Sequence, residues 1–219
     1  MKRFFPSVVL MCIAAAGVAC THHVTLNTTA SIDATVARQL QVSVGLYLSP
    51  ALKQAKLEDR ANWENKYVFD NLGAAVSNTI NQATRRVFQK VQELEAYPTE
   101  QMTIERGLDL VIIPRLNEAT LALNTEIGFW GNDAAGAMHL AVEMAVFTRE
   151  FMQLTMVRAT GNGIGEQGIG LFSSGKSEFS VSVENALRDM GNNAVQQLYG
   201  NYDIRQFVEA LAAEEDETW

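Results

Sequence analysis

The chain has 219 residues, of which 25 are acidic and 17 basic, so its formal net charge is −8 at pH 7. That negative balance argues against a nucleic-acid partner, because surfaces that bind nucleic acid are rich in lysine and arginine. Without the first 19 residues, about 200 remain, which suffices for one domain with a hydrophobic core. The only long apolar run lies at the start and is too short to span a membrane as a helix.

The first 20 residues follow the pattern of an export signal. Two basic residues precede an apolar run over residues 4–16, which leads into Gly17-Val18-Ala19-Cys20. A charged segment, an apolar segment and small residues in this order are typical of a cleaved signal. The cysteine resembles that of a bacterial lipobox, whose thiol receives a lipid and becomes the new N-terminus, although Gly17 replaces the usual leucine. The alternative is an ordinary signal peptide with an incidental cysteine.

The cysteines and histidines near the start bear on redox and metal chemistry. Cys12 would leave with the signal and Cys20 would carry lipid, so neither a disulfide nor a catalytic thiol is expected. His22 and His23 are too few for a metal site, and we expect no metal and no cofactor. We expect residues 1–19 to be the lipoprotein signal peptide, 20–40 a flexible tether, 41–213 the folded domain and 214–219 an acidic tail. A short strand at Val24-Thr25-Leu26 is the alternative for part of the tether.

Residues 42–48 alternate between apolar and polar, which predicts a half-buried strand ended by Pro50. The polar segment 51–70 is expected to be a loop with a helical turn. Asp70 or Asn71 can then cap a helix. Its apolar stripe comprises Leu72, Val76, Ile80, Ala83, Val87 and Val91. The basic residues toward its end, Arg85, Arg86 and Lys90, are expected to form a solvated face that suits the helix dipole.

Further along, residues 108–113 form an apolar run closed by Pro114, which predicts a buried strand. Residues 121–129 and 138–146 alternate on either side of the turn-forming Gly131-Asn132-Asp133, as in a long hairpin with one apolar side. Another strand is expected at 152–156, and a glycine-rich connection at 161–175. A second apolar stripe predicts a further helix through Val183, Leu187, Met190, Ala194 and Leu198. Residues 202–213 are expected to form a terminal helix.

The order is therefore strand-helix-strand-strand-strand-helix. It predicts an α+β fold, a two-layer sandwich of an antiparallel or mixed sheet with two helices on one face. Alternation within the strands supports one covered face, because a sheet covered on both faces shows continuous apolar runs.

A phosphate-binding loop formula occurs at residues 170–177, with Gly170, Gly175, Lys176 and Ser177 in its defining positions. Three points weigh against nucleotide binding. The apolar stripe of the next helix begins near 181–183 instead of at the lysine, and no apolar strand ends in an aspartate suited to magnesium. An exported protein also meets no nucleoside triphosphate. The dinucleotide-like spacing of glycines at 163–168 lacks a following helix and is weaker still.

No catalytic arrangement emerges from the sequence. The nucleophile motif Gly-x-Ser-x-Gly is absent, and His139 falls on the polar face of a predicted strand. Glu126 and Glu143 are placed to face one another across the hairpin, which could raise the pKa of one carboxyl group. Without a pocket this pair is no indication of acid–base chemistry, and we expect no enzymatic activity.

Phe129 and Trp130 stand at the hairpin turn. Exposed aromatic side chains often contact a partner or a membrane interface, and the alternative is that these two fold back over the core. Each limb of the hairpin has about the ten residues that a membrane-spanning strand needs. Several copies could then form a ring with their hairpins in the outer membrane, although an ordinary core hairpin shows the same alternation.

Taken together, Cys20, the strand at 42–48 and the two helical stripes resemble small outer-membrane lipoproteins, such as the LPS-assembly lipoprotein and the soluble part of the curli-secretion lipoprotein. The resemblance implies a lipid, such as palmitate, on Cys20 and a scaffolding or secretion role without catalysis. In such lipoproteins Thr21, which stands here in place of aspartate, implies sorting to the periplasmic face of the outer membrane. We therefore expect a lipid-anchored scaffold with an unidentified envelope protein as partner. The alternative is a homo-oligomeric secretion ring with hairpin 119–147 in the membrane, and nucleotide binding through the 170–177 loop is less favoured.

Overall fold

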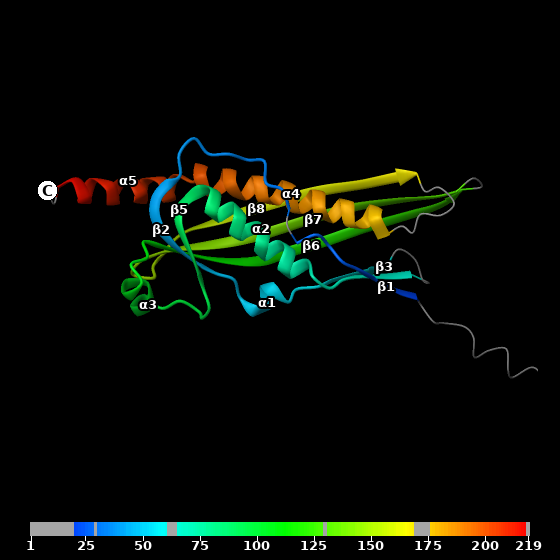
Figure 1. The fold of residues 1–219 in the computed structure, drawn as a ribbon, viewed down its shortest axis with the longest axis horizontal. Coiled ribbons are helices and arrows are strands. Elements are labelled where there is room, and N and C mark those ends of the chain that lie inside the picture. Colours follow the sequence, from blue (N-terminus) through cyan, green and yellow to red (C-terminus); the bar gives the residue numbers. More distant parts are fainter. Residues whose placement is uncertain (1–19, 29, 61–64, 129–130, 169–175, 218–219) are drawn as a thin grey trace, which may run out of the picture.

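A computed structural model describes residues 20–28, 30–60, 65–128, 131–168 and 176–217 as an elongated α+β fold (Figure 1). Its elements in chain order are β1 (Cys20–Val24), β2 (Leu40–Tyr47), α1 (Pro50–Lys53), β3 (Leu57–Arg60), β4 (Asn65–Phe69), α2 (Leu72–Val87), β5 (Phe88–Leu94), α3 (Glu100–Glu105), β6 (Leu110–Gly128), β7 (Gly131–Thr148), β8 (Gln153–Gly168), α4 (Lys176–Gly200) and α5 (Tyr202–Glu217). The signal peptide predicted at 1–19 lies outside the described residues.

The larger sheet has the strand order β5-β2-β6-β7-β8. It is mixed, because β2 runs parallel to β5 and β6, whereas β6, β7 and β8 are antiparallel neighbours. Helices α2 and α4 lie on the same face of this sheet (Figure 1). The α+β fold predicted from the sequence is confirmed, and β2, α2, β6, β7, β8 and α4 follow the predicted order. A smaller sheet of order β1-β4-β3 was not expected.

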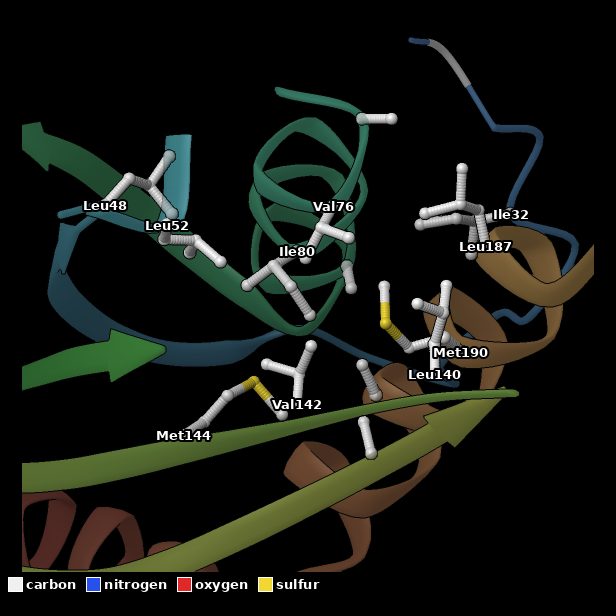
Figure 2. Close-up of a cluster of buried hydrophobic side chains, with 14 of the residues drawn as sticks. Ile32, Leu48, Leu52, Val76, Ile80, Leu140, Val142, Met144, Leu187 and Met190 are labelled. Carbon is white, nitrogen blue, oxygen red and sulfur yellow. The ribbon is translucent and has the colours of Figure 1, made fainter. Parts of the chain in front are cut away.

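The core lies between the larger sheet and its two helices. Figure 2 shows Val142 and Met144 of β7 beneath Ile80 of α2, with Leu140 close to Met190 of α4. All five side chains are fully buried. Burying a large aliphatic side chain contributes about 1.5–3 kcal/mol, so the alternation in the strands and the stripes on the helices are the features that hold the two layers together.

The segment expected to be a tether belongs to the folded domain instead. Its first residues form β1, and Val24, Leu26 and Ile32 are buried in the main core. The backbone N–H groups of residues 33 and 34 both donate to Oδ1 of Asn192 on α4, at 2.8 Å each. The segment 51–70, expected to be a loop with a helical turn, contains the short helix α1 but also the strands β3 and β4.

Several predicted boundaries were wrong. The helix that begins at Leu72 ends at Val87, because Phe88 takes up extended backbone angles (φ −109°, ψ 143°) and Val91 belongs to β5. Pro114 does not end β6. The strand β2 pairs with β6 only at residues 110–112, so from Pro114 onward β6 is paired through β7 alone, and an edge strand tolerates proline. The acidic residues up to Glu217 continue α5 and do not form a separate tail.

The glycine-rich segment from residue 161 is also part of a strand. Gly161 and Gly163 lie within β8, facing α4. A Cβ atom on Gly161 would meet the backbone of Ala186 and Met190, and one on Gly163 would meet that of Ser182. These glycines therefore let the helix approach the sheet more closely than any side chain would permit, which corrects the expectation of an open connection.

Candidate functional site: the end that carries Cys20 and the hairpin

Cys20, the predicted lipidation site, is the first residue of β1. That strand pairs in parallel with β4, and Cys20 lies opposite Asn65. Val24 ends the strand and is buried in the main core. Four residues of extended chain span about 13 Å, so whatever is attached to Cys20 stays close to the folded domain.

A stack of three rings ties β1 to the rest of the domain. The His22 ring stacks on Tyr67 of β4 at a centroid distance of 5.1 Å, and Tyr67 meets Phe179 of α4 edge-on at 4.8 Å. Aromatic pairs in these geometries contribute about 0.5–1.5 kcal/mol each beyond their burial. Sequence reasoning missed this stack, although the run Tyr67-Val68-Phe69 was an available signal for the strand that supports it.

Charged side chains next to the strands of the small sheet connect β1 to the ends of β3 and β4. Asp70 accepts a hydrogen bond from Lys56 Nζ at 2.6 Å and lies 2.5 Å from Nδ1 of His23. The hydrogen bond from Lys56, followed by that from His23, lowers the pKa of Asp70, and Asp70 in turn raises the pKa of Lys56. All three groups are exposed, so this arrangement orients β1 more than it stabilises the domain.

The hairpin tip lies at the same end of the molecule as β1 (Figure 1). Strands β6 and β7 pair as far as Gly128 opposite Gly131, and Phe129 and Trp130 lie between these two residues in the sequence. These two lie outside the described residues, and their contacts stay a prediction. The described strands thus bring β1, which begins at Cys20, and the paired ends of β6 and β7 to one end of the molecule (Figure 1).

The apolar side of the hairpin is part of the core. Met138, Leu140, Val142, Met144 and Val146 are at most 2% exposed. They lie under α2 and α4, and so does Leu121 on the opposite limb. Where its side chains are described, this side of the hairpin is therefore covered by protein and is not free to contact lipid, which weakens the case for a membrane-inserted ring.

Only two of the four phosphate-loop candidates lie in the described part of the chain. Gly170 and Gly175 lie outside the described residues, whereas Lys176 and Ser177 open α4. The apolar stripe of this helix begins at the buried Phe179, earlier than the expected 181–183, and the helix itself begins at the lysine. The strand before the loop, β8, pairs with antiparallel β7 and forms no parallel βαβ unit. The glycines at 163–168 belong to that strand, so they form no dinucleotide-binding turn.

Among the polar residues considered for catalysis, Glu143 and His139 make ordinary side-chain pairs. Glu143 bonds to Arg115 at 2.9 Å, and Glu126 lies opposite Asp133, so the expectation that Glu126 and Glu143 face one another was wrong. Nδ1 of His139 is 2.8 Å from Oδ1 of Asn162. Within the described ranges no helix is both long and apolar enough to cross a membrane, and no group of three potential ligands could hold a metal ion.

Comparison with known proteins gives only distant likenesses. No family model matches the chain, and no curated protein matches it. A Helicobacter pylori protein described as a proposed homologue of the neuraminyllactose-binding hemagglutinin superposes with a TM-score of 0.45 and 7% identity, over 87% of this chain and all of its own. A minor lipoprotein from Acinetobacter baumannii gives 0.39 and 9%, over 75% of this chain and 93% of its own. A PelC dodecamer from Paraburkholderia phytofirmans gives 0.32 and 10%, over 74% and 96%. Lipoproteins are thus among the proteins that this chain is similar to, and at these scores the likeness carries no argument about function.

Proposed function

We propose that the chain is an outer-membrane lipoprotein, anchored by a lipid on Cys20, that serves as a non-catalytic scaffold in a cell-envelope complex. The observation that supports this most is the position of Cys20 at the start of a strand that belongs to the folded domain. A lipid there would hold the domain directly against the membrane, without an intervening tether. A single acyl chain binds a membrane only marginally, so stable anchoring calls for more than one chain or a second contact.

The hairpin tip is the proposed second contact. The ends of β6 and β7 that flank it lie at the same end as β1 (Figure 1), and aromatic residues favour the boundary between lipid headgroups and acyl chains. With the lipid of Cys20 in the bilayer, Phe129 and Trp130 would meet the same surface. The opposite end of the molecule, with α3 and α5, would then point away from the membrane and be accessible to a protein partner.

Cell fractionation tests the anchor. We expect the parent protein to be found in the outer-membrane fraction and to incorporate labelled palmitate, and we expect Cys20→Ser to lose both properties. Cys12→Ser is the matched control, because it removes the other cysteine of the chain and should change neither. Membrane retention and palmitate labelling of Cys20→Ser would contradict the proposal.

Tryptophan quenching tests the orientation. The chain has three tryptophans, so variants that keep only Trp130 or only Trp219 can be compared in vesicles that contain brominated lipid. We expect the lipidated Trp130 variant to be quenched. The Trp219 variant should be unaffected, because α5 runs to the opposite end of the molecule (Figure 1). Equal quenching of the two would refute this orientation.

A further inference from the structure

Most described lysine and arginine side chains are paired with carboxylates. Those with a carboxylate oxygen within 4.0 Å are Lys53, Lys56, Lys66, Arg115, Arg149, Arg158 and Arg205. The described side chains without such a pair are Arg38, Arg85, Arg86, Lys90, Arg106 and Arg188. Seven of the described cationic side chains are thus paired and six are not, in a chain of net charge −8.

Three of these unpaired cations converge on one depression of about 590 Å³. Arg85 comes from the last turn of α2, Lys90 from β5, and Arg106 from the residue after α3. Ser43 and Val44 of β2 lie between the wall formed by β5 and the wall formed by residues 106–108, in keeping with the strand order β5-β2-β6. No aspartate or glutamate is among the residues that line it.

Helix capping accounts for only part of this arrangement. Arg85 and Arg86 end α2, where cations complement the helix dipole. Arg85 Nε donates to Asn81 Oδ1 at 2.9 Å, and Arg86 Nη1 donates to the Ala34 carbonyl at 3.3 Å. Arg106 is likewise the C-cap residue of α3, whereas Lys90 belongs to a strand, so no helix end accounts for Lys90. Both line the same depression as Arg85, and an anion bound there would offset the repulsion among the three positive charges.

We propose that this depression binds a small multivalent oxyanion that carries phosphate or carboxylate groups. Arginine presents a planar set of N–H donors that matches both groups, and lysine adds a compact positive charge. Gln89, Gln92 and Ser43 line the same space and offer further polar contacts. The volume lies within the range of about 300–1,000 Å³ of ligand sites. The depression is formed by β2, β5 and the α3 end, away from β1 along the molecule (Figure 1), so the proposal does not depend on the lipid anchor.

Calorimetric titration of the purified protein at low ionic strength tests the proposal, with inorganic tripolyphosphate and citrate as separate probes. Binding of tripolyphosphate alone identifies phosphate as the preferred group, and binding of citrate alone identifies carboxylate. We expect the combined substitution Arg85→Gln, Lys90→Gln and Arg106→Gln to lower the affinity for the probe by about tenfold or more, because each charge-assisted contact is lost. Arg188→Gln is the matched control, because it removes an exposed, unpaired arginine from α4, and it should change the affinity by less than about twofold.

The proposal is overturned if neither probe binds the parent protein, or if Arg188→Gln weakens binding as much as the combined substitution does. The three substituted side chains are exposed, so we expect the variant to fold, and a circular dichroism spectrum checks this. If the combined variant does not fold, the affinity of the single variant Lys90→Gln for the same probe tests the proposal. Its side chain makes none of the helix-end contacts, and a loss of affinity of less than about twofold with this variant would also overturn the proposal.

Discussion

The close approach of α4 to β8 predicts a large effect for the smallest possible substitution at Gly161. In Gly161→Ala the new methyl group would lie 2.6 Å from Cβ of Met190, and nearer still to the backbone of Ala186. Helix backbone cannot rotate away as a side chain can, so α4 would have to shift from the sheet. Overpacking of this kind costs about 1–3 kcal/mol, and we expect the upper end here. For a domain of this size, that lowers Tm by about 6–12 °C.

Gly200→Ala is the matched control. Gly200 ends the same helix, and a Cβ atom there would meet nothing within 4 Å. Alanine is a better helix former than glycine by about 0.8–1 kcal/mol, so this variant should be as stable as the parent or slightly more stable. Thermal unfolding followed by circular dichroism, on a Cys20→Ser background that removes the lipid, compares the two. If Gly161→Ala unfolds within about 2 °C of the parent, the close packing of β8 against α4 is refuted.

Two further predictions concern the core and the small sheet. Leu140→Ala should lower the free energy of unfolding in urea by about 2–5 kcal/mol, because Leu140 is fully buried between the sheet and the helices, and a loss below about 1 kcal/mol would contradict that burial. The pKa of Asp70 is lowered in the folded state by hydrogen bonds from Lys56 and His23, so its contribution to stability is complete above about pH 4 and is lost as the pH falls through the lowered folded-state pKa. Unfolding curves between pH 2 and 6 should therefore show a smaller acid dependence for Asp70→Asn, and identical curves for variant and parent would refute this linkage.

Where local pattern and tertiary role agree, the sequence predicted the fold well. Val42, Val44 and Leu46 are buried in the main core, as their alternation predicts, and so are Met138, Leu140, Val142, Met144 and Val146 of β7. The opposite face of β2 is covered as well at Gly45, by Leu94 and Leu108 of a second, smaller cluster. The stripe on α4 through Leu187 and Met190 is buried as expected. In each case the period of burial equals the period of the secondary structure, so a window of ten residues carries the signal.

Predictions from the sequence were wrong where the burial of a residue depends on a distant part of the chain. Gly161 and Gly163 suggested a connection between strand and helix, because nothing near them in sequence shows that α4 passes over them. Ile32 lies in a polar stretch, and only the packing of α4 explains its burial, since Gly191 leaves room for its side chain. Val91 continued the helical stripe of α2, but pairing with β2 places it in a strand.

The two candidate sites also differ in whether the sequence alone identifies them. Cys20 can be identified from its neighbours alone, because a signal peptide is a local feature. The anion-binding depression could not be, because Arg106 approaches Arg85 and Lys90 only through the order of the strands. Arg85 and Lys90 were accordingly interpreted as a solvated face.

The lipid on Cys20 is the central claim, and intact-mass spectrometry of the protein purified from membranes tests it most directly. We predict a mature chain that begins at Cys20 and carries the added mass of acyl chains, with the modified residue located on the N-terminal peptide. A chain that retains residues 1–19, or an unmodified Cys20, would contradict the proposal.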